Sequence, residues 1–349
     1  MNPVNKFKEI VLFGTGVAAP RALQYFRKKG IRVKYYCDND KRKIGRTFHG
    51  VNIFSPMNLK NEIDPVVVIT SAFVQEIKKQ LEEIGVKKIY YFPMLGYASY
   101  EKIEDVDDSL TINNNKGNIS KLESILYDKL SVKVFRNIIN NKISWNGEYL
   151  NEIGNAQDIY FPSDIMKLST KESFVDAGAY TGDTIRVLLK KTRGRFNKIY
   201  GFEPSDNIFK KLQQWIKKYN NPNIKCFKKG LYDTNNRLRA TLMGDTGDSA
   251  IKIDGKDWMD VVALDTFFGN KEPITLIKMD IEGAEKQAIL GARTLIQTFK
   301  PKLSICLYHS CEDLWEIPFL IKSIMPEYKL FLRPHSQYLN HTICYASVQ

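Results

Sequence analysis

The segment Phe174–Thr184, FVDAGAYTGDT, constrains the fold of this chain more than any other stretch. It predicts a short buried strand, a glycine turn and the first turn of a helix, with an acid, Asp176, at the end of the strand. About one strand–helix unit later, IYGFEPS predicts a second strand that ends in a second acid, Glu203. This order favours an open α/β sheet that binds a nucleoside beyond the carboxyl ends of its strands.

The charges around this glycine turn indicate which ligand it suits. Asp176 precedes Gly178, and Asp183 follows Gly182. Two negative charges at a helix N-terminus stabilise the helix but repel a pyrophosphate. They suit a cationic ligand such as S-adenosylmethionine, which carries an ammonium and a sulfonium but no phosphate. Glu203 is placed to accept hydrogen bonds from both ribose hydroxyls. A buried turn with helix-capping acids and no ligand is the alternative at this point.

A second glycine loop, GTGVAA, lies near the N-terminus and has different neighbours. Gly14 and Gly16 follow a predicted strand and open a helix that contains Arg21, and Asp38 ends the next strand. This sequence fits the dinucleotide-binding fingerprint, in which backbone amides face an anion and the acid binds ribose hydroxyls. Arg21 would assist a phosphate. A nucleotide or nucleotide-sugar site is one interpretation, and a glycine turn that only lets strand and helix pack closely is the other.

Three further ionisable residues are expected on the rim of the second sheet. The apolar strand in LIKMDIEGAE ends in Asp280 and Glu282, and the strand LSICLYH ends in His309. Because ligands of open α/β sheets lie at the carboxyl ends of the strands, we expect these side chains to lie near Asp176 and Glu203. They are the candidate catalytic residues.

Methyl transfer from a sulfonium is an in-line displacement, which requires close positioning and removal of the proton of the nucleophile. The ordinary pKa of His309 suits a base, and Asp280 would orient either the base or the acceptor. A divalent ion held by Asp280 and its neighbours is a competing way to activate a hydroxyl. The sequence does not distinguish between a histidine base and a divalent ion. The scattered histidines show no zinc signature, so no metal ligands are assigned.

The pattern of elements predicts three parts. Residues 1–96 alternate strand and helix signals and predict a small Rossmann-like domain that binds a nucleotide or nucleotide sugar. Residues 97–170 begin with an acidic, asparagine-rich linker and continue as a helical connector. Residues 171–349 form a second α/β unit, interrupted by an antiparallel insertion.

Composition excludes few classes of protein. The net charge is +13, but the basic residues stand in short groups among acids, with no aromatic-plus-glycine RNA motif. This favours solvated helix faces or recruitment of an anionic substrate over a nucleic-acid partner. No apolar run is long enough for a membrane span, and the start lacks the pattern of a signal peptide. The odd number of cysteines, with no Cys-x-x-Cys pair, indicates free thiols in a reducing compartment. We therefore expect a cytoplasmic location.

Several motifs together resemble the FkbM family of S-adenosylmethionine-dependent methyltransferases. The matching stretches are YFPSDI (Tyr160–Ile165), FVDAGAYTGDT, YGFEPS, LDTF (Leu264–Phe267), IKMDIEGAE and PKLSICLYH. The resemblance covers about half the chain. It implies a Rossmann-like class I methyltransferase sheet of seven strands whose last strand is antiparallel, and O-methylation of a sugar or another small natural-product hydroxyl. The resemblance also implies cofactor contacts from Asp176, Gly178, Ala179 and Glu203. We add Gly182, which belongs to the same glycine loop, to the predicted cofactor-binding residues.

The catalytic base does not carry over from the family, so His309, Asp280 and Glu282 are predicted from their strand-end positions alone. Residues 1–95 resemble the small nucleotide-sugar-binding domain found ahead of some sugar acetyltransferases. The combined hypothesis is an O-methyltransferase that acts on a glycan or a small molecule, including a nucleotide-linked sugar. A nicotinamide-dependent oxidoreductase or nucleotide-binding protein that uses the first loop is one alternative. A non-catalytic scaffold with a degenerate site is another.

Overall fold

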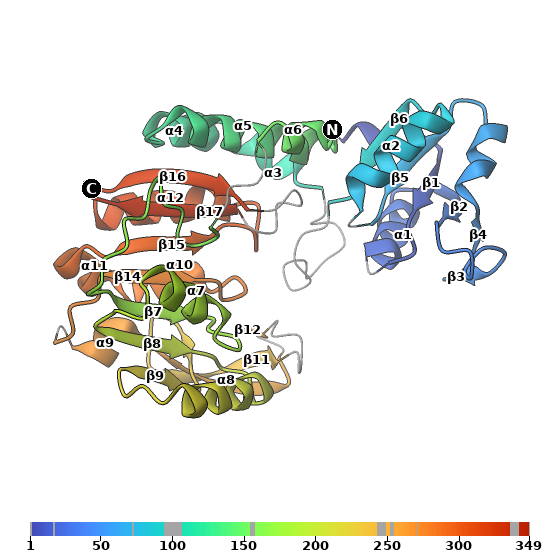
Figure 1. Cartoon of the computed structure of the whole chain (residues 1–349). Coiled ribbons are helices and arrows are strands. Elements are labelled where there is room, and N and C mark those ends of the chain that lie inside the picture. Colours follow the sequence, from blue (N-terminus) through green and yellow to red (C-terminus); the bar gives the residue numbers. More distant parts are fainter. Residues whose placement is uncertain are drawn as a thin grey trace.

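The chain builds two mostly parallel sheets joined by helices, and a smaller four-stranded sheet (Figure 1). The computed structural model describes residues 2–16, 18–71, 73–93, 107–153, 158–242, 249–251, 255–269, 271–335 and 342–348. Within these residues, no helix is both long and apolar enough to cross a membrane. The prediction of a mixed α/β fold with two Rossmann-like sheets is confirmed.

The N-terminal sheet has six strands in the order β3-β4-β2-β1-β5-β6. Its strands are β1 (Glu9–Phe13), β2 (Arg32–Cys37), β3 (Thr47–Phe48), β4 (Val51–Phe54), β5 (Val66–Ile69) and β6 (Lys88–Tyr91). Helices α1 (Ala18–Lys28) and α2 (Val74–Ile84) and the 3-10 turns η1 (Pro3–Lys6) and η2 (Pro56–Asn61) complete this part. All four residues of β5 are buried, as expected for a central parallel strand that is covered on both faces.

A helical connector follows, with α3 (Ser109–Asn114), α4 (Lys116–Ile125), α5 (Lys129–Ser144) and α6 (Glu148–Asn151). Trp145, the C-cap of α5, is buried in the N-terminal core, where its ring centroid lies 5.5 Å from that of Tyr25 and 5.6 Å from that of Phe92. Its carbonyl also accepts a hydrogen bond of 2.9 Å from the amide of Tyr91. The other side of α5 contributes Val134 to the core of the second sheet, so this helix joins both cores.

The C-terminal sheet has seven strands in the order β16-β17-β15-β14-β7-β8-β9. They are β7 (Ser173–Ala177), β8 (Lys198–Phe202), β9 (Ile224–Phe227), β14 (Leu276–Met279), β15 (Lys302–Cys306), β16 (Lys329–Pro334) and β17 (Thr342–Ser347). Strand β17 is antiparallel to both of its neighbours, and the other pairs are parallel. This confirms the expected class I methyltransferase sheet with a reversed last strand.

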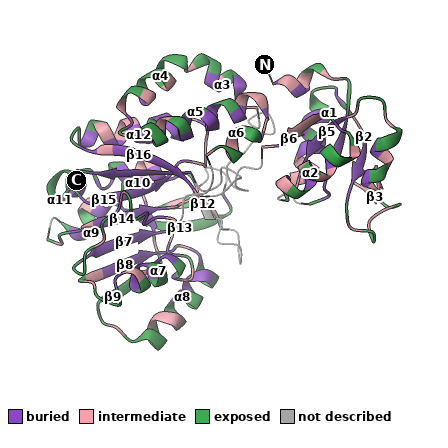
Figure 2. Ribbon diagram, turned by 45° about the horizontal axis from the view of Figure 1, so that its top comes forward, coloured by how far each residue is buried: buried purple, intermediate pink, exposed green. Residues whose placement is uncertain are grey.

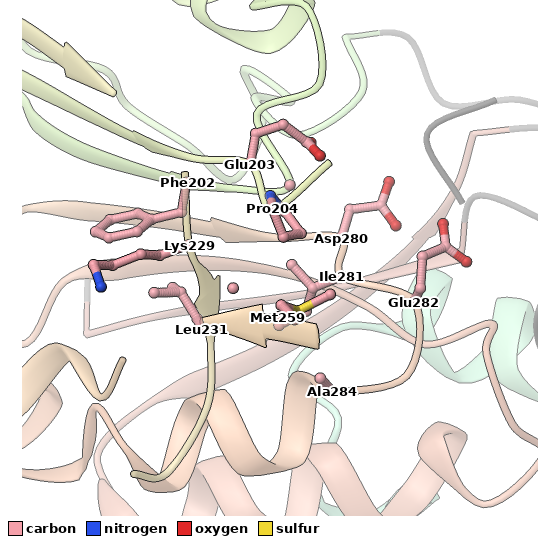
Figure 3. A pocket seen from close by; sticks show the side chains of 12 residues that line it. Phe202, Glu203, Pro204, Lys229, Leu231, Met259, Asp280, Ile281, Glu282 and Ala284 are labelled. Atoms are coloured by element: carbon pink, nitrogen blue, oxygen red, sulfur yellow. The ribbon is translucent and has the colours of Figure 1, made fainter. Parts of the chain in front are cut away.

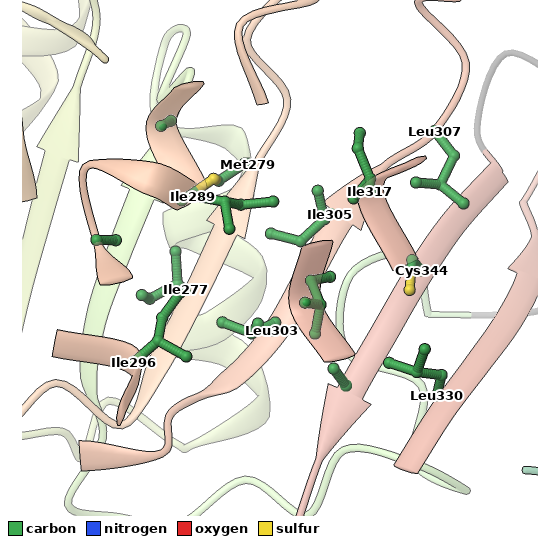
Figure 4. Packing of buried hydrophobic residues seen from close by; sticks show 14 of the residues in the cluster. Ile277, Met279, Ile289, Ile296, Leu303, Ile305, Leu307, Ile317, Leu330 and Cys344 are labelled. Atoms are coloured by element: carbon green, nitrogen blue, oxygen red, sulfur yellow. The ribbon is translucent and has the colours of Figure 1, made fainter. Parts of the chain in front are cut away.

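Helices cover both faces of this sheet, and its central strands are buried (Figure 2). The helices are α7 (Asp183–Lys191), α8 (Asp206–Tyr219), α9 (Leu264–Phe268), α10 (Glu285–Leu290), α11 (Arg293–Phe299) and α12 (Asp313–Ile324). Figure 4 shows how side chains of adjacent strands and covering helices meet in one core, among them Ile277, Leu303 and Ile289. This packing fixes the strand ends that carry the site.

The predicted antiparallel insertion is a four-stranded sheet in the order β10-β13-β11-β12. Its strands are β10 (Gly230–Leu231), β11 (Asn236–Leu242), β12 (Ser249–Ile251) and β13 (Asp257–Val262). Strand β11 is antiparallel to both neighbours, whereas β10 and β13 run parallel. The insertion supplies Leu231 and Met259 to the wall of the cavity described below.

Candidate functional site

An open cavity lies beyond the carboxyl ends of β7, β8 and β14 (Figure 3). Its empty volume, which includes space open to solvent, is about 430 Å³. Phe202, Leu231 and Met259 form part of an apolar wall, and Glu203 and Asp280 are among its charged residues. The cavity therefore occupies the place that the strand-end acids predicted.

The glycine turn after β7 has a structural requirement for glycine. Gly178 has a φ of +75°, and a Cβ atom there would lie 2.0 Å from the carbonyl oxygen of Asp280. Gly182 caps α7 at a φ of +85°, where a Cβ atom would lie 3.0 Å from the ring of Trp215. Gly178 lines the cavity, whereas Ala179 is fully buried. Close approach of the loop to the end of β14 thus explains Gly178 before any ligand is considered.

Asp176 lies beneath the loop rather than on the rim. It is fully buried, and one of its carboxylate oxygens lies 3.1 Å from Nζ of Lys278 on β14. Lys278 also donates hydrogen bonds to the carbonyl oxygens of Ala177 and Gly178, at 3.0 and 2.7 Å. Burial raises the pKa of Asp176 to about 6, although Lys278 opposes this shift. The expected rim position of Asp176 is wrong, because the buried lysine holds the carboxylate inside the fold. Its contact with a ligand stays a prediction.

Glu203 does face the cavity, although only 3% of the residue is exposed. Its two carboxylate oxygens accept hydrogen bonds from the amides of Tyr180, at 3.1 Å, and Ser205, at 2.9 Å. Burial raises the pKa of Glu203 to about 7, against the lowering effect of the two amides. The amides fix the carboxylate between the glycine turn and the start of α8.

Asp280 stands in the cavity wall, held by two tyrosines. Its carboxylate oxygens accept hydrogen bonds from the hydroxyls of Tyr160, at 2.8 Å, and Tyr308, at 2.5 Å. Burial raises the pKa of Asp280, but Lys278, His309 and the two hydroxyls outweigh burial and leave it below its ordinary value. The carboxylate is therefore anionic at neutral pH.

His309 lies behind Asp280, surrounded by carboxylates. Its Nδ1 is 3.2 Å from Oε1 of Glu285, and its Nε2 is 3.5 Å from Oε2 of Glu282 and 3.7 Å from Oδ1 of Asp280. Burial lowers the pKa of His309, but Glu285 and Glu282 outweigh burial and raise it well above the ordinary value. The structure thus brings the three predicted catalytic residues together. The expectation of an ordinary histidine pKa is wrong because of these carboxylates.

Sequence reasoning missed Glu285, Tyr160, Tyr308 and Lys278. Glu285 accepts hydrogen bonds from the amides of Ile281, at 2.8 Å, and Gly283, at 3.1 Å, and so shapes the turn after β14. Its spacing from Asp280 in DIEGAE is the one signal that pointed to it. The two tyrosines gave no such signal, since aromatic residues are common in strands and their flanks. Lys278 did give one, because a lysine inside the apolar run LIKM is almost never buried without a partner.

In the N-terminal glycine loop, the strand-end acid is Asp38, and its carboxylate contacts residues of its own domain. Oδ2 of Asp38 accepts hydrogen bonds from the amide and the hydroxyl of Thr15, at 3.0 and 2.5 Å, and lies 3.1 Å from Nζ of Lys43. Gly14 has a φ of +106°, Gly16 has open space where a Cβ would lie, and Arg21 is half-buried on α1. Asp38 therefore binds its own glycine loop, where the sequence predicted a carboxylate free for a ribose.

Comparison with known protein families decides the class of the second sheet. Residues 6–90 match a domain described as C2185-like, N-terminal, and residues 176–331 match the methyltransferase FkbM domain. Residues 176–331 form an FkbM methyltransferase domain. This confirms the resemblance drawn from the motifs, and the FkbM domain contains Asp176, Glu203, Asp280 and His309.

The fold of nearly the whole chain has a solved counterpart. It is similar to a structure described as methyltransferase FkbM from Methylobacillus flagellatus KT, with a TM-score of 0.80 and 24% sequence identity over 97% of this chain and 90% of that one. The chain is also 25% identical over 107 residues to the redox-sensing transcriptional repressor Rex of Treponema denticola. That match takes in 28% of this chain and 51% of the repressor, so the chain spans about half the length of this curated relative.

Proposed function

We propose that this protein is an S-adenosylmethionine-dependent methyltransferase that methylates a hydroxyl of a sugar, in a glycan or a nucleotide-linked sugar. The observation that carries the proposal is the fixed carboxylate of Glu203 in the cavity wall of the FkbM domain. A carboxylate offers about four lone-pair sites, and two backbone amides use two of them. Two sites are left for the paired hydroxyls of a ribose.

The rest of the cavity suits a nucleoside with a cationic extension. Leu231, Met259 and Ile281 offer apolar surface beside Glu203 for a base, and Asp280 and Glu282 bring negative charge to the same wall. Bound there, S-adenosylmethionine would supply an electrophilic methyl group on a sulfonium. Negative side chains would hold a sulfonium or an ammonium, and they would repel the phosphates of a dinucleotide.

We assign Asp280 and Glu282 to the acceptor side, because both line the cavity. Asp280 is anionic, and it can orient an acceptor hydroxyl by accepting its hydrogen bond. His309 lies behind them and, free of metal, carries a proton at neutral pH. It therefore supplies positive charge to the carboxylates, and it must lose a proton before it can act as the base predicted from its ordinary pKa.

The sugar acceptor rests on the family resemblance, and the N-terminal domain would contribute by holding an anionic part of the substrate. A nicotinamide-dependent oxidoreductase is less favoured, because Asp38 is committed to Thr15 and Lys43. We also propose a cytoplasmic location, which agrees with the five free cysteines: Cys37, Cys226, Cys306, Cys311 and Cys344.

Isothermal titration of the full chain with S-adenosylmethionine tests the cofactor. We expect saturable binding that weakens about a hundredfold in Glu203→Ala, because two hydrogen bonds to a charged group are lost. Asp206→Asn is the matched control, since Asp206 is an exposed acid three residues away that pairs with Lys228. No heat with the wild type, or equal affinity in Glu203→Ala, would contradict the proposal. Mass spectrometry of sugar nucleotides and glycans, with and without the gene, would then identify the methylated acceptor.

A further inference from the structure

The cluster behind the cavity wall combines three carboxylates with one imidazole. Asp280, Glu282 and Glu285 surround His309, whose side chain is only 2% exposed. Lys278, the nearby lysine, already forms the ion pair with Asp176. Even with a protonated imidazole, the cluster itself has an excess of negative charge, which a further cation would balance.

His309 points to what that cation is. Among the hydrogen bonds between described residues, none reaches either of its buried ring nitrogens. The Nε2 distances of 3.5 and 3.7 Å to Glu282 and Asp280 are too long for strong hydrogen bonds. Oxygen and nitrogen ligands about 2.1 Å from one octahedral ion lie about 3 Å apart, close to the 3.2 Å between Nδ1 and Glu285. A buried imidazole that lies among carboxylates at such spacings, with neither ring nitrogen in a hydrogen bond, is typical of metal ligands.

We propose that Asp280, Glu285 and His309 bind a divalent metal ion, with Glu282 adding negative charge beside it. One ligand atom from each of the three residues lies within 4.8 Å of the others. Two carboxylate oxygens and one imidazole nitrogen suit an ion of the Mn²⁺ type, since carboxylates favour Mg²⁺ and Mn²⁺ and imidazole favours transition metals. The ion would enter through the cavity, where the side chains of Asp280 and Glu282 are 19% and 21% exposed.

Neighbouring groups orient the proposed ligands through hydrogen bonds, as the outer-shell residues of known metal sites do. Tyr160 and Tyr308 donate their hydroxyls to Asp280, and backbone amides orient Glu285. Tyr160 adopts this position with a φ of +67°, a conformation that non-glycine residues rarely take. The carboxylates are thus oriented by the fold, so metal binding would cost little reorganisation.

This inference deepens the proposed function and, in its catalytic part, rests on it. A divalent ion beside Asp280 would lower the pKa of an acceptor hydroxyl at the cavity wall and so remove the need for His309 as a base. Binding of the ion itself does not depend on S-adenosylmethionine. The alternative occupant of the cluster is a proton on His309.

The test is titration of the EDTA-treated full chain with Mn²⁺, with free Mn²⁺ measured by electron paramagnetic resonance. We expect one saturable equivalent, at least tenfold weaker binding in His309→Gln and Asp280→Asn, and a smaller loss in Glu282→Gln. Glu327→Gln is the control, because Glu327 is an exposed acid paired with Lys300. No saturable binding at millimolar Mn²⁺, or equal binding in all variants, would overturn the proposal.

Two further measurements separate this result from misfolding and from failure of the proposed function. Circular dichroism should give the wild-type spectrum for Glu282→Gln, the variant least buried in the cluster, so that its weaker Mn²⁺ binding reports on the site. Glu203→Ala should bind S-adenosylmethionine about a hundredfold more weakly and bind Mn²⁺ as tightly as the wild type. Loss of Mn²⁺ in Glu203→Ala would contradict an independent metal site.

Discussion

The two glycine loops of this chain differ in where their strand-end acids go. In the N-terminal sheet, Asp38 turns back onto Thr15 and Lys43 and closes its own loop. In the C-terminal sheet, Asp176 is locked to Lys278 beneath the loop, and the next acid, Glu203, faces the cavity. The N-terminal loop matches the dinucleotide-binding motif better, yet the C-terminal loop has the carboxylate that faces a cavity and can bind a ligand. The sequence motif of a glycine loop is therefore a weaker guide to its ligand than the hydrogen bonds and ion pairs of the carboxylates around it.

The largest difference in lost stability is expected between substitutions of the two lysines that pair with strand-end acids. Lys278→Met leaves Asp176 unpaired where the side chains of the pair are 3% and 0% exposed, which should cost ~3–5 kcal/mol of unfolding free energy. Lys43→Met removes a partner that is 42% exposed and should cost no more than ~1 kcal/mol. Differential scanning calorimetry measures both. Equal unfolding temperatures would show that the Asp176–Lys278 pair is no more important than the exposed one.

The glycines should differ almost as much. Gly178→Ala combines a φ of +75° with a Cβ 2.0 Å from a backbone oxygen, so we expect a loss of roughly 3 kcal/mol or more and weaker cofactor binding. Gly16→Ala meets open space and should stay within about 0.5 kcal/mol of the wild type. Urea unfolding monitored by tryptophan fluorescence makes the comparison. A costly Gly16→Ala would indicate that the first loop is the more constrained one.

Binding of S-adenosylmethionine should depend on pH through Glu203. Its pKa of about 7 means that the carboxylate is present above pH 7 and becomes protonated as the pH falls. Since the ribose hydroxyls need the carboxylate, affinity should be constant above pH 8 and fall toward tenfold per unit below pH 7. Isothermal titration at several pH values should also show proton release at pH 7. A profile that is flat between pH 6 and 8 would argue against contact with Glu203.

The smallest expected effect on binding of S-adenosylmethionine is that of Asp38→Asn. This change weakens the hydrogen bonds to Thr15 and the ion pair with Lys43, for a loss of ~1–2 kcal/mol in stability. Affinity for S-adenosylmethionine should stay within a factor of two, and NADH should give no fluorescence change. An NADH signal that Asp38→Asn abolishes would instead favour a dinucleotide site in the first loop.

Much of the fold was readable from the sequence, because buried parallel strands and glycine turns leave local patterns. VVVI in β5 and FVDA in β7 are apolar runs that end at turns, and Glu203 was correctly placed at the end of β8. The division of the chain at residues 96 and 170 stays a prediction, although α5 is built into both cores.

The partners of the acids could not be read, because they depend on contacts between distant strands. Asp176 faces Lys278 because β7 and β14 are paired in that register, across about 100 residues of sequence. The same holds for Asp280, whose hydroxyl donors come from Tyr160 and Tyr308. No local pattern encodes such registers, so sequence reasoning found the acids and missed what neutralises or orients them.

The most direct test of the central claim is a crystal structure of the full chain with S-adenosylhomocysteine. The account predicts the nucleoside in the cavity beyond β7 and β8, with both ribose hydroxyls at hydrogen-bond distance from the carboxylate of Glu203. A nucleoside bound at the Gly14 loop against Asp38, or one in the cavity that leaves Glu203 without a contact, would contradict it.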